Sequence, residues 1–295
     1  MKFQKSTLEN YLFILPAVVI FSIFYIYPFY ETFNLSLHNW NGISASRVFV
    51  GLRNFKEVFF QDRHWWPAMG HAGYITLIAL TFQNALALIL AMACDRQIRL
   101  GKFYRLVFFI PPVLSEVVVA LIWKWIFEPN YGLLNFWLAN LGLHNLAREW
   151  LSRPETALSC VALIHSWKGF GWGFIILLAG LQTIPQQLYE AARVDGANSW
   201  RRFRHVTIPL MIPVFVLVSI LTILGSMQAF VLVYQMTAAT PALGTTVPVT
   251  RILNAMREVQ PPRFGFACAQ GVVFGLILVI LSFLQLRLSK KMRQA

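Results

Sequence analysis

The sequence predicts an all-α polytopic membrane protein with six transmembrane helices. Of its 295 residues, 57% are hydrophobic and only 13% are charged, whereas about a quarter of the residues in a soluble domain are charged. The apolar residues also come in long blocks. They lack the period of about 2 or 3.6 residues that marks half-buried strands and helices in soluble proteins.

Six apolar runs are each long enough to cross about 30 Å of hydrocarbon at about 1.5 Å per residue. They cover residues 11–30, 72–94, 106–127, 157–184, 213–237 and 264–286. The first run is too long for a secretory signal and no cleavage site of small residues follows it, so we interpret it as a retained anchor. We therefore expect a transmembrane domain over residues 11–287, with tails at 1–10 and 288–295.

The basic residues predict the orientation of these helices. Segments 1–10, 95–105, 185–209 and 287–295 hold 14 Lys and Arg residues, and the alternate segments 31–71, 128–156 and 236–263 hold 9 in a longer total stretch. Lys and Arg accumulate on the cytoplasmic side of a membrane. Both chain ends and segment 185–209 are therefore expected to be cytoplasmic. The net charge of +13 is spread over these loops, which argues against a nucleic-acid partner.

Motifs for catalysis or cofactor binding are absent from the sequence. It has no phosphate-binding loop of the form G-x-x-x-x-G-K-[ST] and no paired His or Cys residues at metal-ligand spacing. Cys94, Cys160 and Cys268 all fall inside apolar runs and predict no disulfide framework. We expect no catalytic residues, no metal and no cofactor in this chain.

One polar stretch, residues 189–210, lies between two apolar runs and still carries helix signals. Gly196 favours a sharp turn because glycine adopts positive φ without strain. Asn198 or Ser199 can cap a second helix, which Pro209 is expected to end. We predict two short helices joined by a tight turn, a protruding elbow that another protein can grip.

The elbow and the residues that follow it also match a known motif. The matching positions are Glu190-Ala191-Ala192, Asp195-Gly196-Ala197, Phe203, Val206, Ile208-Pro209 and Pro213. This pattern resembles the "EAA" coupling loop of permease subunits in bacterial ABC importers, which docks into a cleft of a cytoplasmic ATPase. The resemblance implies that seven residues couple this chain to such a partner: Glu190, Ala191, Ala192, Asp195, Gly196, Ala197 and Phe203.

Further segments narrow the resemblance to one branch of that family. Residues 39–42 read N-W-N-G, residues 49–55 read F-V-G-L-R-N-F, and residues 127–135 read F-E-P-N-Y-G-L-L-N. They are similar to elements of the maltose and glycerol-phosphate branch of carbohydrate importers. The chain departs from that branch after Met236, where it has Ala238-Ala239-Thr240-Pro241 in place of a glycine-rich segment.

The resemblance implies a type I importer fold and a location in the bacterial inner membrane. It also implies the partners: a second permease subunit, two ATP-binding cassette subunits that hold ATP and Mg, and an external solute-binding protein. ATP hydrolysis is then expected in the partner subunits.

Ionisable residues inside the apolar runs are candidates for a solute pathway. Such a side chain costs at least about 2.5 kcal/mol in hydrocarbon, so it normally faces a cavity or a partner. Glu116, Lys124 and Lys168 fall in this class. We expect Lys124 to pair with Glu128 or to reach the membrane surface. Glu116 either lines the pathway or pairs with Lys168.

Alignment with the maltose importer adds residues from the fourth and fifth runs. Trp faces and nearby polar groups suit the C–H surfaces and hydroxyls of a sugar, although plain helix packing is the alternative for the fourth run. The implied pathway residues are His165, Lys168, Gly169 and Trp172 in the fourth run and Thr222, Gly225, Ser226 and Ala229 in the fifth.

Two other functions compete with a sugar permease. An ion-coupled secondary carrier would show inverted repeats and paired broken helices, and neither is evident in the sequence. A membrane enzyme would need a cluster of acids, histidines or a metal motif at one interface. We therefore favour the permease subunit of an ATP-driven sugar or oligosaccharide importer, with the charge of the sugar left open.

Overall fold

The computed structural model describes residues 2–95, 101–257 and 259–294. Part of the 95–105 loop and the two chain ends lie outside these residues. The described helices include five that can cross a membrane and one bent pair that forms a sixth span: Tyr11–Ser36, Trp65–Asp95, Gly101–Val113 with Glu116–Ile126, Pro154–Gln182, Ser199–Met227 and Phe264–Arg287. The all-α fold class is confirmed.

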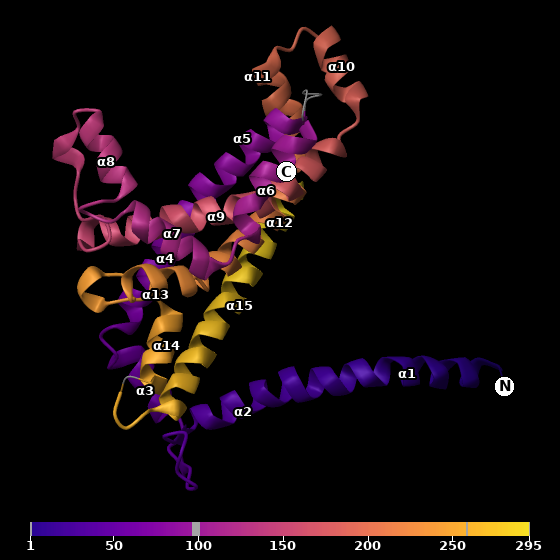
Figure 1. Cartoon of the computed structure of the whole chain (residues 1–295). Helices are drawn as coiled ribbons and strands as arrows, with labels where there is room; N and C mark the ends of the chain where they lie inside the picture. Colours follow the sequence, from indigo (N-terminus) through magenta and orange to yellow (C-terminus); the bar gives the residue numbers. More distant parts are fainter. Residues whose placement is uncertain (1, 96–100, 258, 295) are drawn as a thin grey trace. The chain divides into compact units, whose positions relative to one another are not determined.

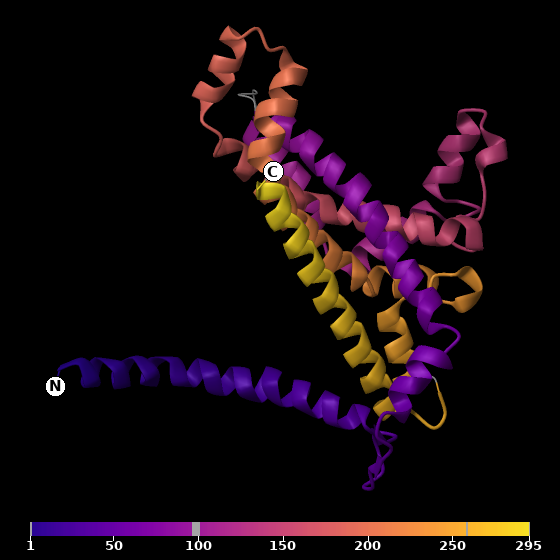
Figure 2. The ribbon, with the colours of Figure 1, turned by 180° about the vertical axis from the view of Figure 1, so that it is seen from behind.

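The chain forms two compact units. Unit 1 comprises Met1–Arg63 and Arg251–Leu276, and unit 2 comprises His64–Thr250 and Ile277–Ala295. Two helices cross the boundary between the units in sequence, α14 (Pro248–Arg257) and α15 (Phe264–Gln294). Figure 1 and Figure 2 show the ribbon from opposite sides.

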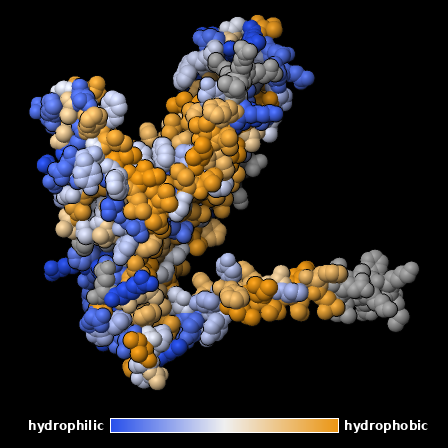
Figure 3. Space-filling view, viewed as in Figure 1, coloured by the Kyte–Doolittle hydropathy of each residue, from blue (hydrophilic) through white to orange (hydrophobic). Residues whose placement is uncertain are grey.

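Unit 1 begins with one long apolar helix. It consists of α1 (Lys2–Phe21), a π-helical turn η1 (Ser22–Ile26) and α2 (Tyr27–Ser36). The predicted end at residue 30 is too early, because the π-helical turn η1 directly before α2 accommodates the missing amide hydrogen of Pro28 and the helix continues to Ser36. Figure 3 shows mostly hydrophobic side chains along this helix from Tyr11 onward, as expected of a helix that faces lipid or another apolar partner.

The rest of unit 1 combines short elements with a partly buried polar cluster. The elements are the antiparallel pair β1 (His38–Asn39) and β2 (Val48–Phe49), helix α3 (Arg53–Phe60), and parts of α14 and α15. The two terminal nitrogens of the Arg263 guanidinium group donate to the two Glu57 carboxylate oxygens at 2.6 Å each. This hydrogen-bonded carboxylate raises the pKa of the guanidinium group. Asp62 accepts hydrogen bonds from Arg251 at 3.1 Å and from Gln270 at 3.0 Å. These bonds tie the segment after α3 to α14 and α15.

Unit 2 is built around one central helix, α9 (Pro154–Gln182). Among the described elements, this helix packs against five other α-helices. They are α4 (Trp65–Ile78), α5 (Asn84–Asp95), α6 (Gly101–Val113), α12 (Ile208–Met227) and α13 (Val231–Thr237), with the π-helical turn η2 (Ala79–Gln83) between α4 and α5. The remaining elements of unit 2 are α7 (Glu116–Ile126), α8 (Leu133–Asn140), η3 (His144–Leu146), α10 (Gln186–Val194), α11 (Ser199–Arg202), η4 (Phe203–Thr207) and η5 (Pro241–Leu243).

The third predicted span, residues 106–127, is not one straight helix. Helices α6 and α7 are separated by a two-residue break and meet at 94°. Pro111 and Pro112 remove two backbone donors from the last turn of α6, and Ser115 takes an extended conformation before α7 begins. The break places Glu116 at the first residue of α7.

The fifth predicted span, residues 213–237, starts and ends in the wrong places. Its helix already runs from Ser199 through η4 into α12, so Pro209 does not end a helix. A π-helical turn directly before Pro209 accommodates the missing amide hydrogen. At the other end α12 stops at Met227, where the Gln228 side chain donates to the Leu224 carbonyl at 3.1 Å and replaces a backbone partner.

Segment 236–263 carries a backbone feature at the point where the sequence departs from its branch. Ala238 and Ala239 have φ values of 53° and 51°. This left-handed region suits glycine and disfavours a residue with a Cβ atom. The chain therefore keeps, with two alanines, a backbone conformation that a glycine-rich segment would adopt without strain.

A close helix contact in unit 2 yields a stability prediction. A Cβ atom at Gly171 would lie 2.6 Å from the Phe108 carbonyl oxygen of α6, so Gly171→Ala must push the two backbones apart. We expect a loss of about 1–3 kcal/mol, measured as a lower midpoint of thermal unfolding in detergent. Gly73→Ala is the matched control, because nothing lies within 4 Å of a Cβ there. An equal midpoint for both variants would contradict the close contact.

Candidate functional site

The elbow has the local structure that its sequence predicts. Helix α10 follows Pro185 and ends before Gly196, whose φ is +76°. The amide of Ala197 donates back to the Ala192 carbonyl at 2.8 Å, as in a helix C-terminus that is closed by a left-handed residue. Of the two predicted caps, Asn198 is used, because its side chain accepts from the Arg201 amide at 2.9 Å.

Two contacts hold the arms of the elbow in place. The Tyr189 hydroxyl of α10 lies 3.0 Å from the Thr207 hydroxyl at the end of η4. The rings of Trp200 and Phe203 lie 5.6 Å apart on the second arm. Figure 1 and Figure 2 both show α10 and α11 as separate arms joined by a loop.

The surface of the elbow is open. Neither α10 nor α11 has a buried residue, and Val194 and Trp200 are 88% and 64% exposed. Figure 3 shows hydrophilic side chains gathered over this part of unit 2. Among the described residues, none forms a hydrogen bond or an ion pair with the Glu190 carboxylate. The elbow thus combines exposed apolar side chains with a carboxylate that can still accept hydrogen bonds.

All seven predicted coupling residues lie on this elbow. Glu190, Ala191, Asp195 and Gly196 are exposed, and Ala192, Ala197 and Phe203 are partly buried. Their side by side placement follows from local sequence, since the turn at Gly196 brings the ends of α10 and α11 together.

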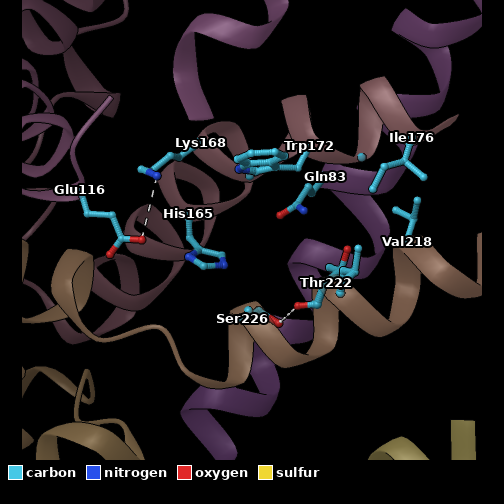
Figure 4. Close-up of a pocket in the computed structure, with 13 residues that line it drawn as sticks. Gln83, Glu116, His165, Lys168, Trp172, Ile176, Val218, Thr222 and Ser226 are labelled. Atoms are coloured by element: carbon cyan, nitrogen blue, oxygen red, sulfur yellow. Dashed lines mark hydrogen bonds and ion pairs between the residues drawn. The ribbon is translucent and has the colours of Figure 1, made fainter. Parts of the chain in front are cut away.

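A second candidate site is a cavity of about 410 Å³ inside unit 2. Its walls come from η2, α7, α9 and α12. The lining residues are Gln83, Glu116, His165, Lys168, Gly169, Trp172, Gly173, Ile176, Val218, Leu221, Thr222, Gly225 and Ser226. Figure 4 shows how these side chains face the same space from different helices.

The cavity brings together nearly all of the predicted pathway residues. From the fourth run it takes His165, Lys168, Gly169 and Trp172, and from the fifth Thr222, Gly225 and Ser226, together with Glu116. Ala229 is the exception. It is 6% exposed and packs in the hydrophobic core with Val161 and Leu232, because the chain leaves α12 at Met227 before reaching it.

One end of the cavity carries charged groups. Lys168 Nζ lies 4.0 Å from Glu116 Oε1, so Glu116 both lines the cavity and faces Lys168. The His165 ring lies beside this pair (Figure 4). Lys124 does not line the cavity, and within the described residues no ion pair joins it to Glu128. Glu128 instead accepts from the backbone amides that follow it, at 2.7 and 2.8 Å.

Uncharged polar groups and apolar side chains line the rest of the cavity. The Thr222 hydroxyl donates to Asn84 Oδ1 at 3.0 Å, and the Ser226 hydroxyl lies 2.9 Å from that of Thr76. The Gln83 side chain is buried, and within the described residues its Oε1 atom has no hydrogen-bond partner. A buried acceptor normally has a partner, so Gln83 is an unsatisfied polar group in the wall of this cavity.

Gln83 is the polar lining residue that the sequence did not predict, and four further lining residues lie outside the predicted set: Gly173, Ile176, Val218 and Leu221. An uncharged amide costs less in an apolar run than a charge does, so Gln83 gives a weaker signal there than Glu116 or Lys168. Its position also depends on Gly169, because a Cβ there would lie 2.6 Å from Gln83 Oε1.

Trp172 supplies an aromatic face. Its ring is held edge to face against Phe109, with the centroids 5.2 Å apart, yet the residue stays 58% exposed. Such a fixed and open ring can cover the C–H face of a sugar. As for metals, the described residues contain no group of three or more His, Cys, Asp or Glu side chains that could hold an ion.

Comparison with known proteins agrees with this geometry. A family described as "Binding-protein-dependent transport system inner membrane component" matches residues 83–294. The trehalose/maltose transport system permease protein MalF of Thermococcus litoralis is 31% identical and covers 83% of this chain and 82% of its own. The multiple sugar-binding transport system permease protein MsmF of Streptococcus mutans is also 31% identical, over 95% and 94% of the two chains.

A solved structure has a similar fold. It is a bacterial alginate ABC transporter in complex with an alginate pentasaccharide-bound periplasmic protein. One of its chains matches this one with a TM-score of 0.83 and 21% identity, covering 100% of this chain and 98% of that chain. At this level of identity the likeness shows the fold alone.

The cap of α11 yields a prediction about the elbow. Asn198→Ala leaves the Arg201 amide without its acceptor, which costs about 1 kcal/mol and speeds hydrogen exchange of that amide about fivefold. Mass-spectrometric exchange over the 199–207 segment measures this. Ser199→Ala is the control, because its hydroxyl bonds only the Arg202 side chain. Equal exchange in both variants would show that Asn198 does not hold the turn.

Proposed function

This chain belongs to the family of binding-protein-dependent transport system inner membrane components and is a permease subunit of an ABC importer, and we propose that its cargo is a sugar or an oligosaccharide. As a permease component it is not itself an enzyme. The two curated relatives described above are named for trehalose, maltose and multiple sugars. These names support a carbohydrate as the cargo of this chain.

The observation that carries the proposal is the cavity in unit 2. Its volume of about 410 Å³ lies within the range of about 300–1,000 Å³ typical of small-molecule sites. It offers the exposed face of Trp172, and its wall contains the unpaired Gln83 acceptor and the largely buried hydroxyls of Thr222 and Ser226, both of which already donate within the protein. An aromatic face and several neutral hydrogen-bonding groups are what a sugar requires, since its two faces are apolar and its rim is covered with hydroxyls.

The elbow of α10, α11 and η4 is the proposed coupling point to an ATP-hydrolysing partner. Exposed Val194 and Trp200 offer apolar contact area, and Glu190 offers a carboxylate with free acceptor capacity. The sequence contains no phosphate-binding loop of its own, so ATP and Mg would be held by partner subunits. The excess of Lys and Arg in segment 185–209 and at the chain ends supports a cytoplasmic position for the elbow.

The assembly that follows contains this chain, a second permease subunit, two ATP-binding cassette subunits and an external solute-binding protein. The second permease is part of the proposal because the solved transporter that this chain resembles is an ABC transporter in complex with a periplasmic protein. A location in the bacterial inner membrane follows from the same proposal.

The elbow is tested by Gly196→Trp. The bulky side chain forces a non-glycine residue into φ +76° and fills the open space at the turn. We expect uptake of radiolabelled maltose and trehalose by cells that express the whole importer to be abolished, while sugar binding to the external solute-binding protein is unchanged.

Gly142→Trp is the matched control for this experiment. Gly142 has the same φ of +76° and the same open surroundings, but it lies after α8 and outside the elbow. Its variant suffers equal local strain and should keep uptake. Normal uptake by the Gly196 variant, or equal loss in both variants, would count against a coupling role of the elbow.

The cavity is tested by Trp172→Ala. Loss of the aromatic face removes about 1 kcal/mol from sugar contacts in the membrane. Because the external binding protein meets the sugar first, we expect the maximal uptake rate to fall about fivefold with an unchanged half-saturating concentration. Trp125→Ala is the control, because Trp125 is 70% exposed and does not line the cavity. An unchanged rate in the Trp172 variant would place the sugar elsewhere.

A further inference from the structure

Three titratable side chains line the cavity of unit 2. They are Glu116, His165 and Lys168. Glu116 is the first residue of α7, directly after the break that separates it from α6. Lys168 lies on α9, one turn after His165. Figure 4 shows the carboxylate and the ammonium group pointing toward each other across one end of the cavity.

The distance between the two charges is the informative quantity. Lys168 Nζ and Glu116 Oε1 are 4.0 Å apart, which is longer than the 2.7–2.9 Å or so of a charge-assisted hydrogen bond. The charges therefore compensate each other without using up the hydrogen-bonding capacity of either group. The side chains are 15% and 41% exposed, so the pair is partly shielded from bulk water and open toward the cavity.

We infer that Glu116 is a specificity-determining residue that cancels the charge of Lys168, so that the cavity accepts uncharged sugars and does not retain acidic ones. This inference deepens the proposed function and rests on the cavity being part of the sugar pathway. It selects the neutral class from the two that the sequence left open.

The preference follows from what each solute would meet at this end of the cavity. A sugar hydroxyl can donate to the Glu116 carboxylate and accept from the Lys168 ammonium group at the same time, so it can bridge the gap. A uronate carboxylate would find Lys168 already compensated and would bring a like charge close to Glu116. Such repulsion is a means of discrimination as effective as attraction to the right solute.

Without the Glu116 carboxylate, the charged end of the cavity would be positive and would favour anionic solutes. Lys168 would be an uncompensated cation in a cavity with apolar walls such as Ile176, Val218 and Leu221. A cation in such surroundings attracts anions and concentrates them locally. The carboxylate at the start of α7 is thus the feature that separates a neutral cavity from an anion-binding one.

The test measures the charge of the cavity directly. Gly225 lines the cavity, and nothing lies within 4 Å of a Cβ there, so Gly225→Cys adds a thiol without displacing a neighbour. It is made in the assembled importer with Cys94, Cys160 and Cys268 replaced by alanine. The Gly225→Cys thiol is reacted with an anionic, a cationic and a neutral methanethiosulfonate reagent. Each rate is divided by the rate at which the same reagent reacts with 2-mercaptoethanol in solution, which removes differences in the reagents' own reactivity.

The inference predicts a defined pattern of relative rates. In the parent the anionic and cationic reagents should react at similar relative rates. Glu116→Gln should shift their ratio about tenfold or more toward the anionic reagent, and Lys168→Gln should shift it as far toward the cationic one. The double variant should restore the parental ratio, which guards against a single variant that folds poorly.

Two results would overturn the inference. One is a parent that already prefers the anionic reagent as strongly as Glu116→Gln does, because Lys168 would then be uncompensated. The other is a ratio that Glu116→Gln leaves unchanged. The control places the thiol at Gly142→Cys, outside the cavity, where Glu116→Gln should not alter the ratio.

This experiment is independent of sugar transport, so the two proposals can fail separately. A cavity that shows the expected rates, in an importer whose uptake is unaffected by Trp172→Ala, would keep the charge assignment and reject the sugar pathway. If Trp172→Ala lowers uptake as expected but Glu116→Gln leaves the reagent ratio unchanged, the sugar pathway is kept and the role of Glu116 is rejected.

Discussion

Close approach of neighbouring helices to α9 is the constraint on which the rest of unit 2 depends. Where α6 crosses α9, a Cβ at Gly171 would come within 2.6 Å of a carbonyl oxygen, so glycine alone permits the contact. Small residues serve helix association in membranes in this way, because lipid gives no hydrophobic drive for it. With α6 fixed there, the break after Val113 falls beside α9, and Glu116 is brought to Lys168. The charged end of the cavity thus follows from a packing contact of a glycine.

The break between α6 and α7 illustrates a second general rule. Irregular backbone inside a membrane is tolerated where it lines a cavity or is buried in protein, because its free polar groups then have partners other than lipid. In the break itself Leu114 is partly buried against the core and Ser115 is exposed, and directly after it Glu116 lines the cavity while Val119 and Ala120 lie in the core. The same break that costs backbone hydrogen bonds provides a place for an ionisable residue, and α13 packs against α7 to hold it.

The elbow could be predicted from sequence because its structure is local. Gly196 and Asn198 act on residues within three or four positions, through positive φ and a capping hydrogen bond. The ends of the membrane spans could not be predicted from sequence, because they depend on the backbone conformation of the neighbouring turns. By sequence alone Pro209 predicts the end of a helix, but the π-helical turn that precedes it lets the helix continue. Gln83 lines the cavity although the sequence did not predict it, because three-dimensional packing decides which side of a helix faces an opening. Ala229 was expected to line the cavity but lies in the core, because α12 ends at Met227.

The elbow and the cavity are linked by continuous helices. Helix α9 ends at Gln182, only three residues before α10, and the second arm of the elbow runs through η4 into α12 without interruption. The cavity residues Lys168 and Trp172 lie on α9, and Thr222 and Ser226 lie on α12. A force on the elbow would therefore act along the two helices that form opposite walls of the cavity. The hydrogen bond between Tyr189 and Thr207 joins the arms, so such a force would move both walls as a pair. In the proposed coupling, the turn at Gly196 joins the two arms through which such a force would reach both helices.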